Sequence, residues 1–199
     1  MRCFPLKKEV ILNNTQEKFL SDYKNQTEIP LSPHPGSFGC VRRHHQHEGV
    51  DLYAQDGDEV YAIESGHIVK IFPFTGEHVG TNWWNNTWAI MIESQSGVLN
   101  YGEIIPLQDL TPGQWINSGE AIGHVRTVLT KDKGRPMSML HLELYAHGTK
   151  HAINAWNLNE MQPQSLCNPT NLLIDVAQEL NLVKDMSLWQ NHKNKLKVK

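Results

Sequence analysis

The stretch His47-Glu48-Gly49-Val50-Asp51 carries two metal-binding side chains, a histidine and an aspartate, four residues apart. The spacing is close to His-Glu-x-x-His, in which two histidines bind zinc from adjacent turns of a helix. A helix is disfavoured here, because Gly49 costs about 1 kcal/mol in a helix interior and Val50 is β-branched. We expect an extended segment, in which the glycine lets His47 and Asp51 converge while Glu48 points away from the metal.

A third ligand is expected from SMLHLELYA, residues 138–146. The alternation of a strand places His141 and Glu143 on one face and the three leucines on the other, toward the core. A catalytic zinc site usually takes three protein ligands and keeps one position for water. The strand therefore supplies His141 as a candidate third ligand beside His47 and Asp51.

Most of the chain between these residues has the pattern of short strands, which are β-branched or alternating and are bounded by Gly- and Asp-containing turns. The expected strands are 50–54, 59–65, 67–74, 88–94, 98–104, 120–129 and 138–146. Hairpin-length gaps between them indicate an antiparallel sheet or flattened barrel, so the predicted fold class is mostly β.

The other segments suggest three parts. Residues 1–40 are interpreted as an N-terminal extension with one short helix around residues 16–25. The main domain is predicted at 41–182 and ends in a helix over about 169–182, where Pro follows a capping Asn. Residues 183–199 are predicted to form a basic, solvated tail. The extension could shield a cleft or pack along the sheet.

Two long loops interrupt the strands. The loop at 75–87 contains the adjacent residues Trp83 and Trp84, and the loop at 130–137 is basic. Aromatic loops often line binding grooves, but the two tryptophans could equally anchor their own loop.

Composition limits the classes of function. A formal net charge of −3 argues against a nucleic-acid partner, and the basic end of the chain is short. No stretch has the length and apolarity of a signal peptide or a membrane span, so the sequence predicts no membrane association and a cytoplasmic location by default. Secretion or a periplasmic location would need another export route. The three scattered cysteines predict neither a disulfide framework nor a thiolate metal site.

The motifs together resemble the lysostaphin/LytM-type zinc endopeptidases, which cut peptide cross-links of bacterial cell walls. HEGVD matches that family's His-x-x-x-Asp ligand pair, GDEVYAIESGHIV at 57–69 follows its next strand cadence with one extra residue, and MLHLEL matches its His-x-His element. The likeness covers roughly residues 45–175. It implies a β-sandwich fold, zinc held by His47, Asp51 and His141, and hydrolysis of a peptide or peptidoglycan-like substrate.

Two positions depart from the family pattern. The first His of its His-x-His element is Met139 here, and the His of its Tyr-x-His strand motif is Glu103. Hydrolysis needs a proton acceptor and a group that stabilises the oxyanion. Glu103 is the predicted base, since a carboxylate beside zinc serves that role in other metallopeptidases. The candidates for the oxyanion role are Arg43, His45, His124 and Arg135.

These departures leave alternatives open. The chain could be a catalytically silent zinc domain that binds a peptide, glycan or protein partner, because both auxiliary histidines are absent. It could also be a sheet protein without metal. Glu103 could be an ordinary strand carboxylate or the partner of an arginine. The sequence makes no prediction of oligomeric state.

Overall fold

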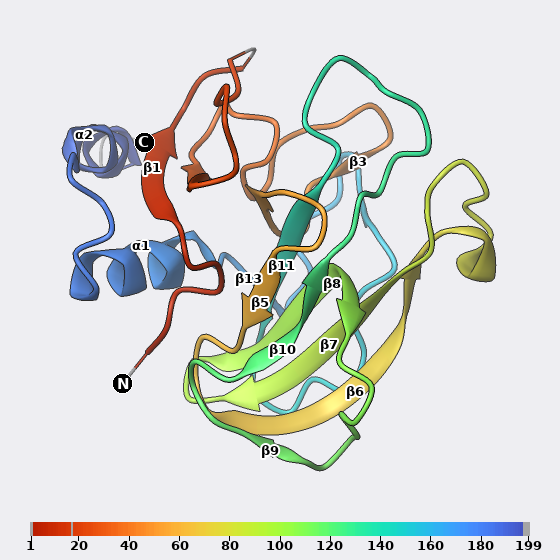
Figure 1. The fold of residues 1–199 in the computed structure, drawn as a ribbon. Coiled ribbons are helices and arrows are strands. Elements are labelled where there is room, and N and C mark those ends of the chain that lie inside the picture. Colours follow the sequence, from red (N-terminus) through yellow and green to blue (C-terminus); the bar gives the residue numbers. More distant parts are fainter. Residues whose placement is uncertain (1, 17, 197–199) are drawn as a thin grey trace.

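The structure is a computed structural model that describes residues 2–16 and 18–196, with only the backbone for 195–196. Its main feature is one antiparallel sheet, which has nine strands within the described residues (Figure 1). The central order is β13-β11-β8-β7-β6-β9, with β4 paired to β11 and β10 paired to both β8 and β5. These strands are β4 Val50–Tyr53, β5 Glu59–Tyr61, β6 Gly66–Thr75, β7 Thr87–Ser94, β8 Gly97–Pro106, β9 Trp115–Ile116, β10 Ala121–Val125, β11 Met139–Tyr145 and β13 Leu166–Cys167.

The sheet divides at β8. Residues 98–102 of β8 pair with β11, whereas residues 104–106 pair with β10. The sheet therefore has two branches and does not close into a barrel. The expectation of a mostly β, antiparallel fold is confirmed, and each of the seven predicted strands overlaps an observed one.

The N-terminal residues contribute to the same core as the sheet. Strands β1 Glu9–Asn13 and β2 Gln26–Pro30 form a separate parallel pair. The buried apolar side chains from this part of the chain are Phe4, Leu6, Val10, Leu12, Ile29 and Leu31.

The helix expected around residues 16–25 is absent from the described residues there, and its position 17 lies outside them. In place of helical hydrogen bonds, backbone amides of this segment donate to side-chain oxygens. The Oδ1 atom of Asn13 accepts from the Thr15 amide at 3.0 Å, and the hydroxyl of Tyr23 accepts from the Leu20 amide at 3.0 Å. Such local bonds compete with helix formation.

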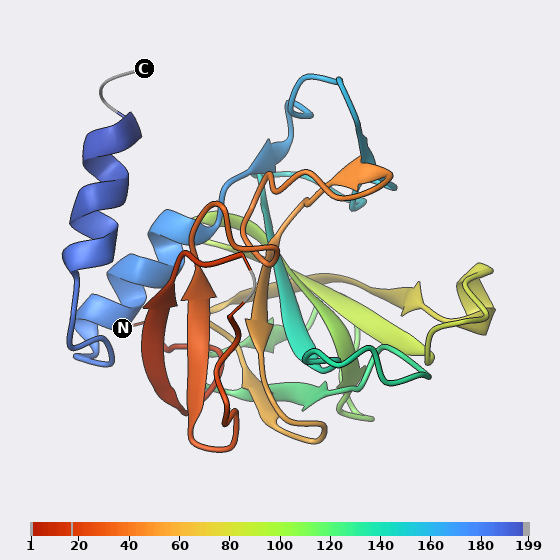
Figure 2. The same cartoon turned by 90° about the horizontal axis from the view of Figure 1, so that it is seen from above.

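Two helices lie with β1 and β2 on one side of the molecule (Figure 2). Helix α1 spans Thr170–Glu179, within the predicted segment, and the Oδ1 atom of Asn168 accepts from the Thr170 amide at 2.9 Å. The expectation of a solvated tail after residue 182 was wrong, because Ser187–Leu196 forms helix α2 and buries Trp189 in the core. Residues 197–199 of that expected tail lie outside the described residues.

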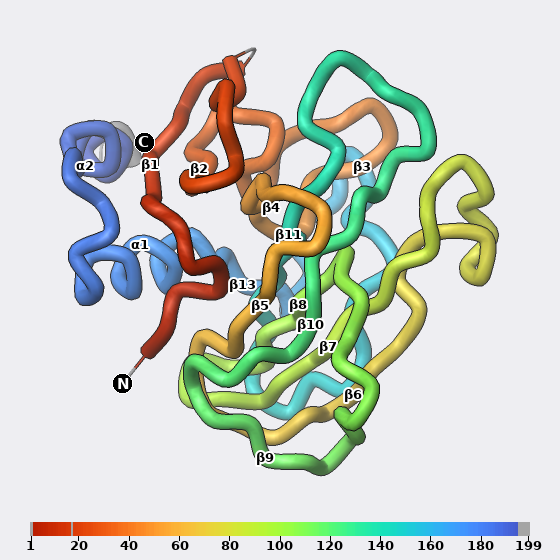
Figure 3. The backbone as a smooth tube through the Cα atoms, in the orientation of Figure 1, coloured from red at the N-terminus to blue at the C-terminus, as the bar shows by residue number. Residues whose placement is uncertain are grey.

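The remaining elements are short. Strands β3 His45–Gln46 and β12 Trp156–Asn157 pair with each other, and the 3-10 helix η1 spans Glu77–Val79. The loops that follow β6 and β10 extend beyond the strands (Figure 3). No helix among the described residues is long and apolar enough to cross a membrane.

Candidate metal centre

The pairing of β4 with β11 brings two predicted ligands together. Asp51 and His141 are direct partners in this antiparallel register, and His47 lies just upstream of β4. Gly49 lets the intervening chain approach β11 closely, since a Cβ there would lie 2.5 Å from the carbonyl oxygen of Leu142. The backbone of Gly49 needs no left-handed conformation, so close approach explains the glycine better than the turn expected from the sequence.

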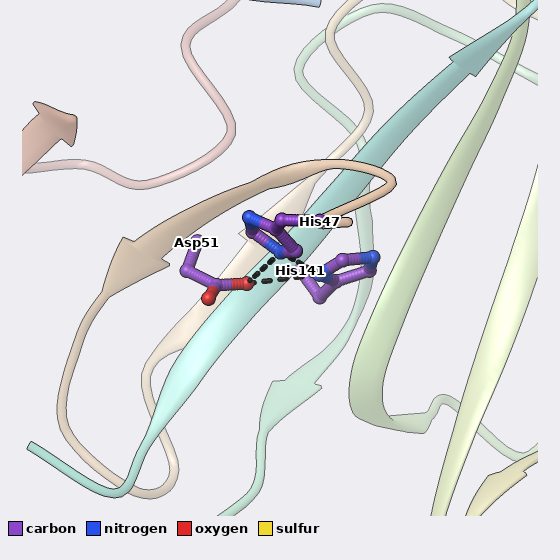
Figure 4. Close-up of side chains that lie close together, drawn as sticks. All are labelled: His47, Asp51 and His141. Carbon is purple, nitrogen blue, oxygen red and sulfur yellow. Dashed lines mark hydrogen bonds and ion pairs between the residues drawn. The ribbon is translucent and has the colours of Figure 1, made fainter. Parts of the chain in front are cut away.

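Three ligand atoms converge at this point (Figure 4). The Nε2 atom of His47 lies 3.0 Å from Oδ1 of Asp51, and Nδ1 of His141 lies 2.9 Å from the same oxygen. The two ring nitrogens are 3.2 Å apart. All three side chains are buried, with exposed fractions of 0%, 5% and 7%. Tetrahedral zinc with bonds of about 2.0–2.1 Å separates its ligands by about 3.3 Å, so this triangle is close to the required size.

Hydrogen bonds at the outer edge of each ring fix its orientation. The Nδ1 atom of His47 lies 3.0 Å from the carbonyl oxygen of Ser37, and Nε2 of His141 lies 3.2 Å from Oε1 of Glu143. Since the carbonyl, and the carboxylate when ionised, accept hydrogen bonds, each outer nitrogen carries the proton and each inner nitrogen presents a lone pair. Outer partners of this kind are typical of metal-ligating histidines.

The donor set therefore fits a cation. Two ring lone pairs and the Asp51 oxygen face one another at hydrogen-bond distances, and three acceptors in contact repel unless a proton or a metal ion lies between them. In the metal-free protein a proton has this role. Burial opposes the charge on His141, yet the hydrogen bonds that its ring donates to Asp51 and Glu143 raise its pKa well above the ordinary value. Burial of His47 lowers its pKa and favours the neutral form that binds metal.

The structure adds a residue that the sequence did not single out. The guanidinium of Arg42 contacts Oδ2 of Asp51, the oxygen that faces away from the histidines. Burial disfavours the Asp51 carboxylate, but His47 and Arg42 hold its pKa well below the usual range. Asp51 is therefore an anion at neutral pH. The position of Arg42 in the sequence did not indicate its contact with Asp51, because no known motif spacing places an arginine there.

Glu143 is itself held in place. Its Oε2 atom accepts from Nδ2 of Asn100 at 2.6 Å and from the hydroxyl of Tyr145 at 3.0 Å. Burial disfavours its charge, but the interaction with His141 lowers the pKa of Glu143 below its ordinary value. The alternation in β11 indicated that Glu143 shares a face with His141, whereas Asn100 and Tyr145 were not recognised as its partners.

Glu103 occupies an irregular position in β8. Gly102 and Glu103 together face the single residue Ala89 of β7, and Glu103 has a φ of 63°. A left-handed conformation costs a residue with a side chain about 1–2 kcal/mol. Bulges of this kind redirect a side chain. Here the residue lines the same cavity as Asp51.

The Glu103 carboxyl is poorly solvated. Its Oε2 atom is buried and has no hydrogen-bond partner within the described chain, and none of the ion pairs there includes it. Burial, followed by the charge of Asp51, raises the pKa of Glu103 to about 8. The geometry brings the predicted base beside the metal cluster, and its role stays a prediction.

A cavity of about 570 Å³ is lined by Asp51 and Glu103, so this cleft reaches the cluster on its Asp51 side, whereas His47 and His141 do not line it. Met139 lines the cleft at the position of the absent auxiliary histidine. The other lining residues that the sequence raised are Arg43, His45, Trp84 and Arg135. His124 pairs within the sheet on β10 and does not line the cleft. Glu48 is directed away, because its Oε1 atom accepts from the Trp156 amide at 2.9 Å.

The fold and the site define a mostly antiparallel β protein with a buried His-Asp-His cluster whose aspartate lines a cleft. The sequence model of peptidase family M23 matches residues 45–154, more than half of the 199-residue chain, and includes all three cluster residues. The chain belongs to peptidase family M23. A search of curated protein sequences found no match.

Solved structures similar to this chain were also found. The antimicrobial peptidase lysostaphin from Staphylococcus simulans is 18% identical over 70% of this chain and 48% of its own, with a TM-score of 0.47. The cbpa protein from L. salivarius REN is 21% identical over 72% of this chain and 88% of its own, with a TM-score of 0.46. Helicobacter pylori Csd3 is 16% identical over 86% of this chain and 42% of its own, with a TM-score of 0.42. This chain thus spans less than half of the lysostaphin and Csd3 structures.

Proposed function

We propose that this protein is a zinc-dependent metallopeptidase that hydrolyses a peptide bond, with cell-wall peptide as the substrate class. The observation that carries the proposal is the set of three converging ligand atoms, two of them on rings whose outer nitrogens are already engaged. His47, Asp51 and His141 would hold the metal. Zinc bound there would supply Lewis acidity and lower the pKa of a water molecule to about 7.

The side chains around the cluster supply the other requirements of hydrolysis. Glu103 lines the cleft beside Asp51 and has a carboxyl oxygen with no partner in the described chain, so it is available to accept and return a proton. Arg43 and Arg135 line the same cleft and bring positive charge for a developing oxyanion. The thioether of Met139 can neither accept this proton nor stabilise an oxyanion.

The test compares metal content and peptide hydrolysis in one preparation. Wild-type protein with one equivalent of zinc is incubated with peptides released from cell walls, and the products are followed by mass spectrometry. We expect hydrolysis that a chelator stops, that zinc restores, and that His141→Ala and Glu103→Gln each reduce at least about 100-fold. Glu93→Gln, on the neighbouring strand β7, is the matched control and should keep full activity.

Two observations favour a second candidate, a zinc domain that binds a partner without cleaving it. Met139 replaces a histidine, and Arg42 already engages one oxygen of Asp51. Stoichiometric zinc in the wild type, bound through His141 but with no hydrolysis of any tested peptide, would overturn the enzymatic proposal and support this one.

A further inference from the structure

A second cavity lies beside the cleft of the metal cluster. It has a volume of about 600 Å³, and we name it the tryptophan–lysine pocket. Its lining residues are Asn82, Trp83, Trp84, Leu129, Thr130, Lys131 and Lys133. Trp84 and Leu129 also line the cleft that contains Asp51, so the two hollows adjoin and share a wall. A ligand bound in the cleft therefore lies next to this pocket.

The two loops that form the pocket are tied together. Trp84 and Leu129 form an antiparallel bridge, and the amide of Asn85 donates to the carbonyl of Val128 at 2.7 Å. The hydroxyl of Thr130 donates to the carbonyl of Trp83 at 2.9 Å. These bonds link segments more than 40 residues apart and fix the positions of the walls. The Trp83 side chain nevertheless stays 64% exposed, edge-to-face with Trp84 at 6.3 Å between ring centroids.

The pocket is positively charged although the chain has a net charge of −3. Lys131 and Lys133 are exposed lining residues, no acidic side chain lines the pocket, and no ion pair within the described chain involves either lysine. The nearby Asp132 is directed to its own loop, where its Oδ1 atom accepts from the Gly134 amide at 2.8 Å.

The cleft next to the pocket continues this positive charge. Arg42, Arg43 and Arg135 line it, and its acidic lining residues, Asp51 and Glu103, both lie at the metal cluster. Arg42 is paired with Asp51, so the uncompensated positive charge of the cleft comes from Arg43 and Arg135, which take part in no ion pair within the described residues. Clustered charges of one sign attract ligands of the opposite sign. The basic side chains thus extend from the cluster to the pocket.

We propose that the tryptophan–lysine pocket is a subsite for acidic peptide, in which Lys131 and Lys133 bind a side-chain carboxylate and Trp83 packs on the adjoining backbone or apolar groups. Ammonium groups pair with carboxylates, and an exposed indole offers a large contact area at low entropic cost. The inference deepens the proposed peptidase function and rests on it. It selects peptides that carry carboxylates near the bond to be cut.

The test measures binding without turnover, so it does not depend on catalysis. Metal-free, chelator-treated wild-type protein is titrated with a blocked pentapeptide of alternating alanine and glutamate, and with the same peptide carrying glutamine. Intrinsic tryptophan fluorescence gives the affinity. We expect the glutamate peptide to bind at least about fivefold more tightly at low salt, and the preference to shrink as salt screens the charges.

Variants assign the preference to the pocket. The double variant Lys131→Gln/Lys133→Gln should bring the affinity ratio of the two peptides close to one, whereas Lys150→Gln, a surface lysine near Glu93, should leave it unchanged. Trp83→Ala should weaken both peptides by a similar factor, measured by calorimetry. The subsite is refuted if the wild type shows no preference for glutamate, or if the preference survives in the double variant.

Two further outcomes are informative. Binding of an acidic disaccharide such as a glucuronate dimer, without binding of the acidic peptide, would overturn the assignment to peptide. Acidic-peptide binding by a protein that never hydrolyses peptide would leave the pocket supported and remove the proposed peptidase activity, so the two failures are distinguishable.

Discussion

The substitution Glu143→Gln tests how the protein prepares His141 for a metal. The carboxylate of Glu143 accepts on two sides, from Nε2 of His141 at 3.2 Å and from Asn100 and Tyr145 at 2.6 and 3.0 Å. The glutamine side chain has the same shape but carries one oxygen and one NH2 group. Its NH2 group must therefore face another hydrogen-bond donor, either on His141 or on Asn100 and Tyr145.

Both orientations of this amide weaken metal binding. With the NH2 group toward His141, the ring must accept at Nε2 and carry its proton on Nδ1, where the ligand lone pair is needed. With the oxygen toward His141, the ring keeps its tautomer but loses the neighbouring negative charge. Loss of such an outer partner lowers metal affinity about 10–100-fold, which corresponds to about 1.4–2.7 kcal/mol.

The assay is competition for zinc with a chromophoric chelator, and thermal melting of the metal-free proteins shows that each variant is folded. Glu93→Gln is the control, because the Glu93 carboxylate accepts from the Gly148 amide at 2.8 Å, far from the cluster in the register of the sheet. A zinc affinity of Glu143→Gln within about twofold of the wild type would refute the reasoning.

Three further predictions concern stability. Glu103→Gly should stabilise the metal-free protein by about 1 kcal/mol in urea unfolding, because glycine accepts the φ of 63° freely; a destabilised variant would contradict the strain. In metal-free protein the folded state holds the Glu103 proton until about pH 8, whereas the unfolded chain releases it near pH 4.5, so this contribution to stability is lost as pH rises. Between pH 5 and 8 the unfolding free energy of the wild type should therefore fall by up to about 3 kcal/mol more than that of Glu103→Gln, and equal falls in the two proteins would contradict this contribution. Trp189→Ala should cost about 3 kcal/mol because this side chain is in the core, and a loss below about 1 kcal/mol would mean that α2 contributes little.

The sequence was sufficient to predict the strands and the convergence of His47, Asp51 and His141, whose role as metal ligands stays a prediction. The alternation of MLHLELY defines the two faces of β11, and Gly49 with Val50 excludes a helix around the ligand pair. Antiparallel pairing then makes Asp51 and His141 neighbours, a contact between residues 90 apart in the chain. The motif spacing supported this pairing before the register was known.

Long-range features were not predictable in the same way. The branching of the sheet at β8 and the parallel pairing of β1 with β2 depend on tertiary packing that no local pattern encodes. The contact of Arg42 with Asp51 depends on how one loop folds over the cluster. Helix α2 was missed because the basic residues near the end of the chain obscured the apolar face that Trp189 supplies.

The central claim is that His47, Asp51 and His141 hold a zinc ion beside the cleft. The most direct measurement is anomalous diffraction at the zinc edge from crystals of protein loaded with one equivalent of zinc. We predict a single strong peak among Nε2 of His47, Oδ1 of Asp51 and Nδ1 of His141. Zinc-loaded crystals with no peak at the cluster, or with zinc bound only at the surface histidines His44 and His45, would contradict the claim.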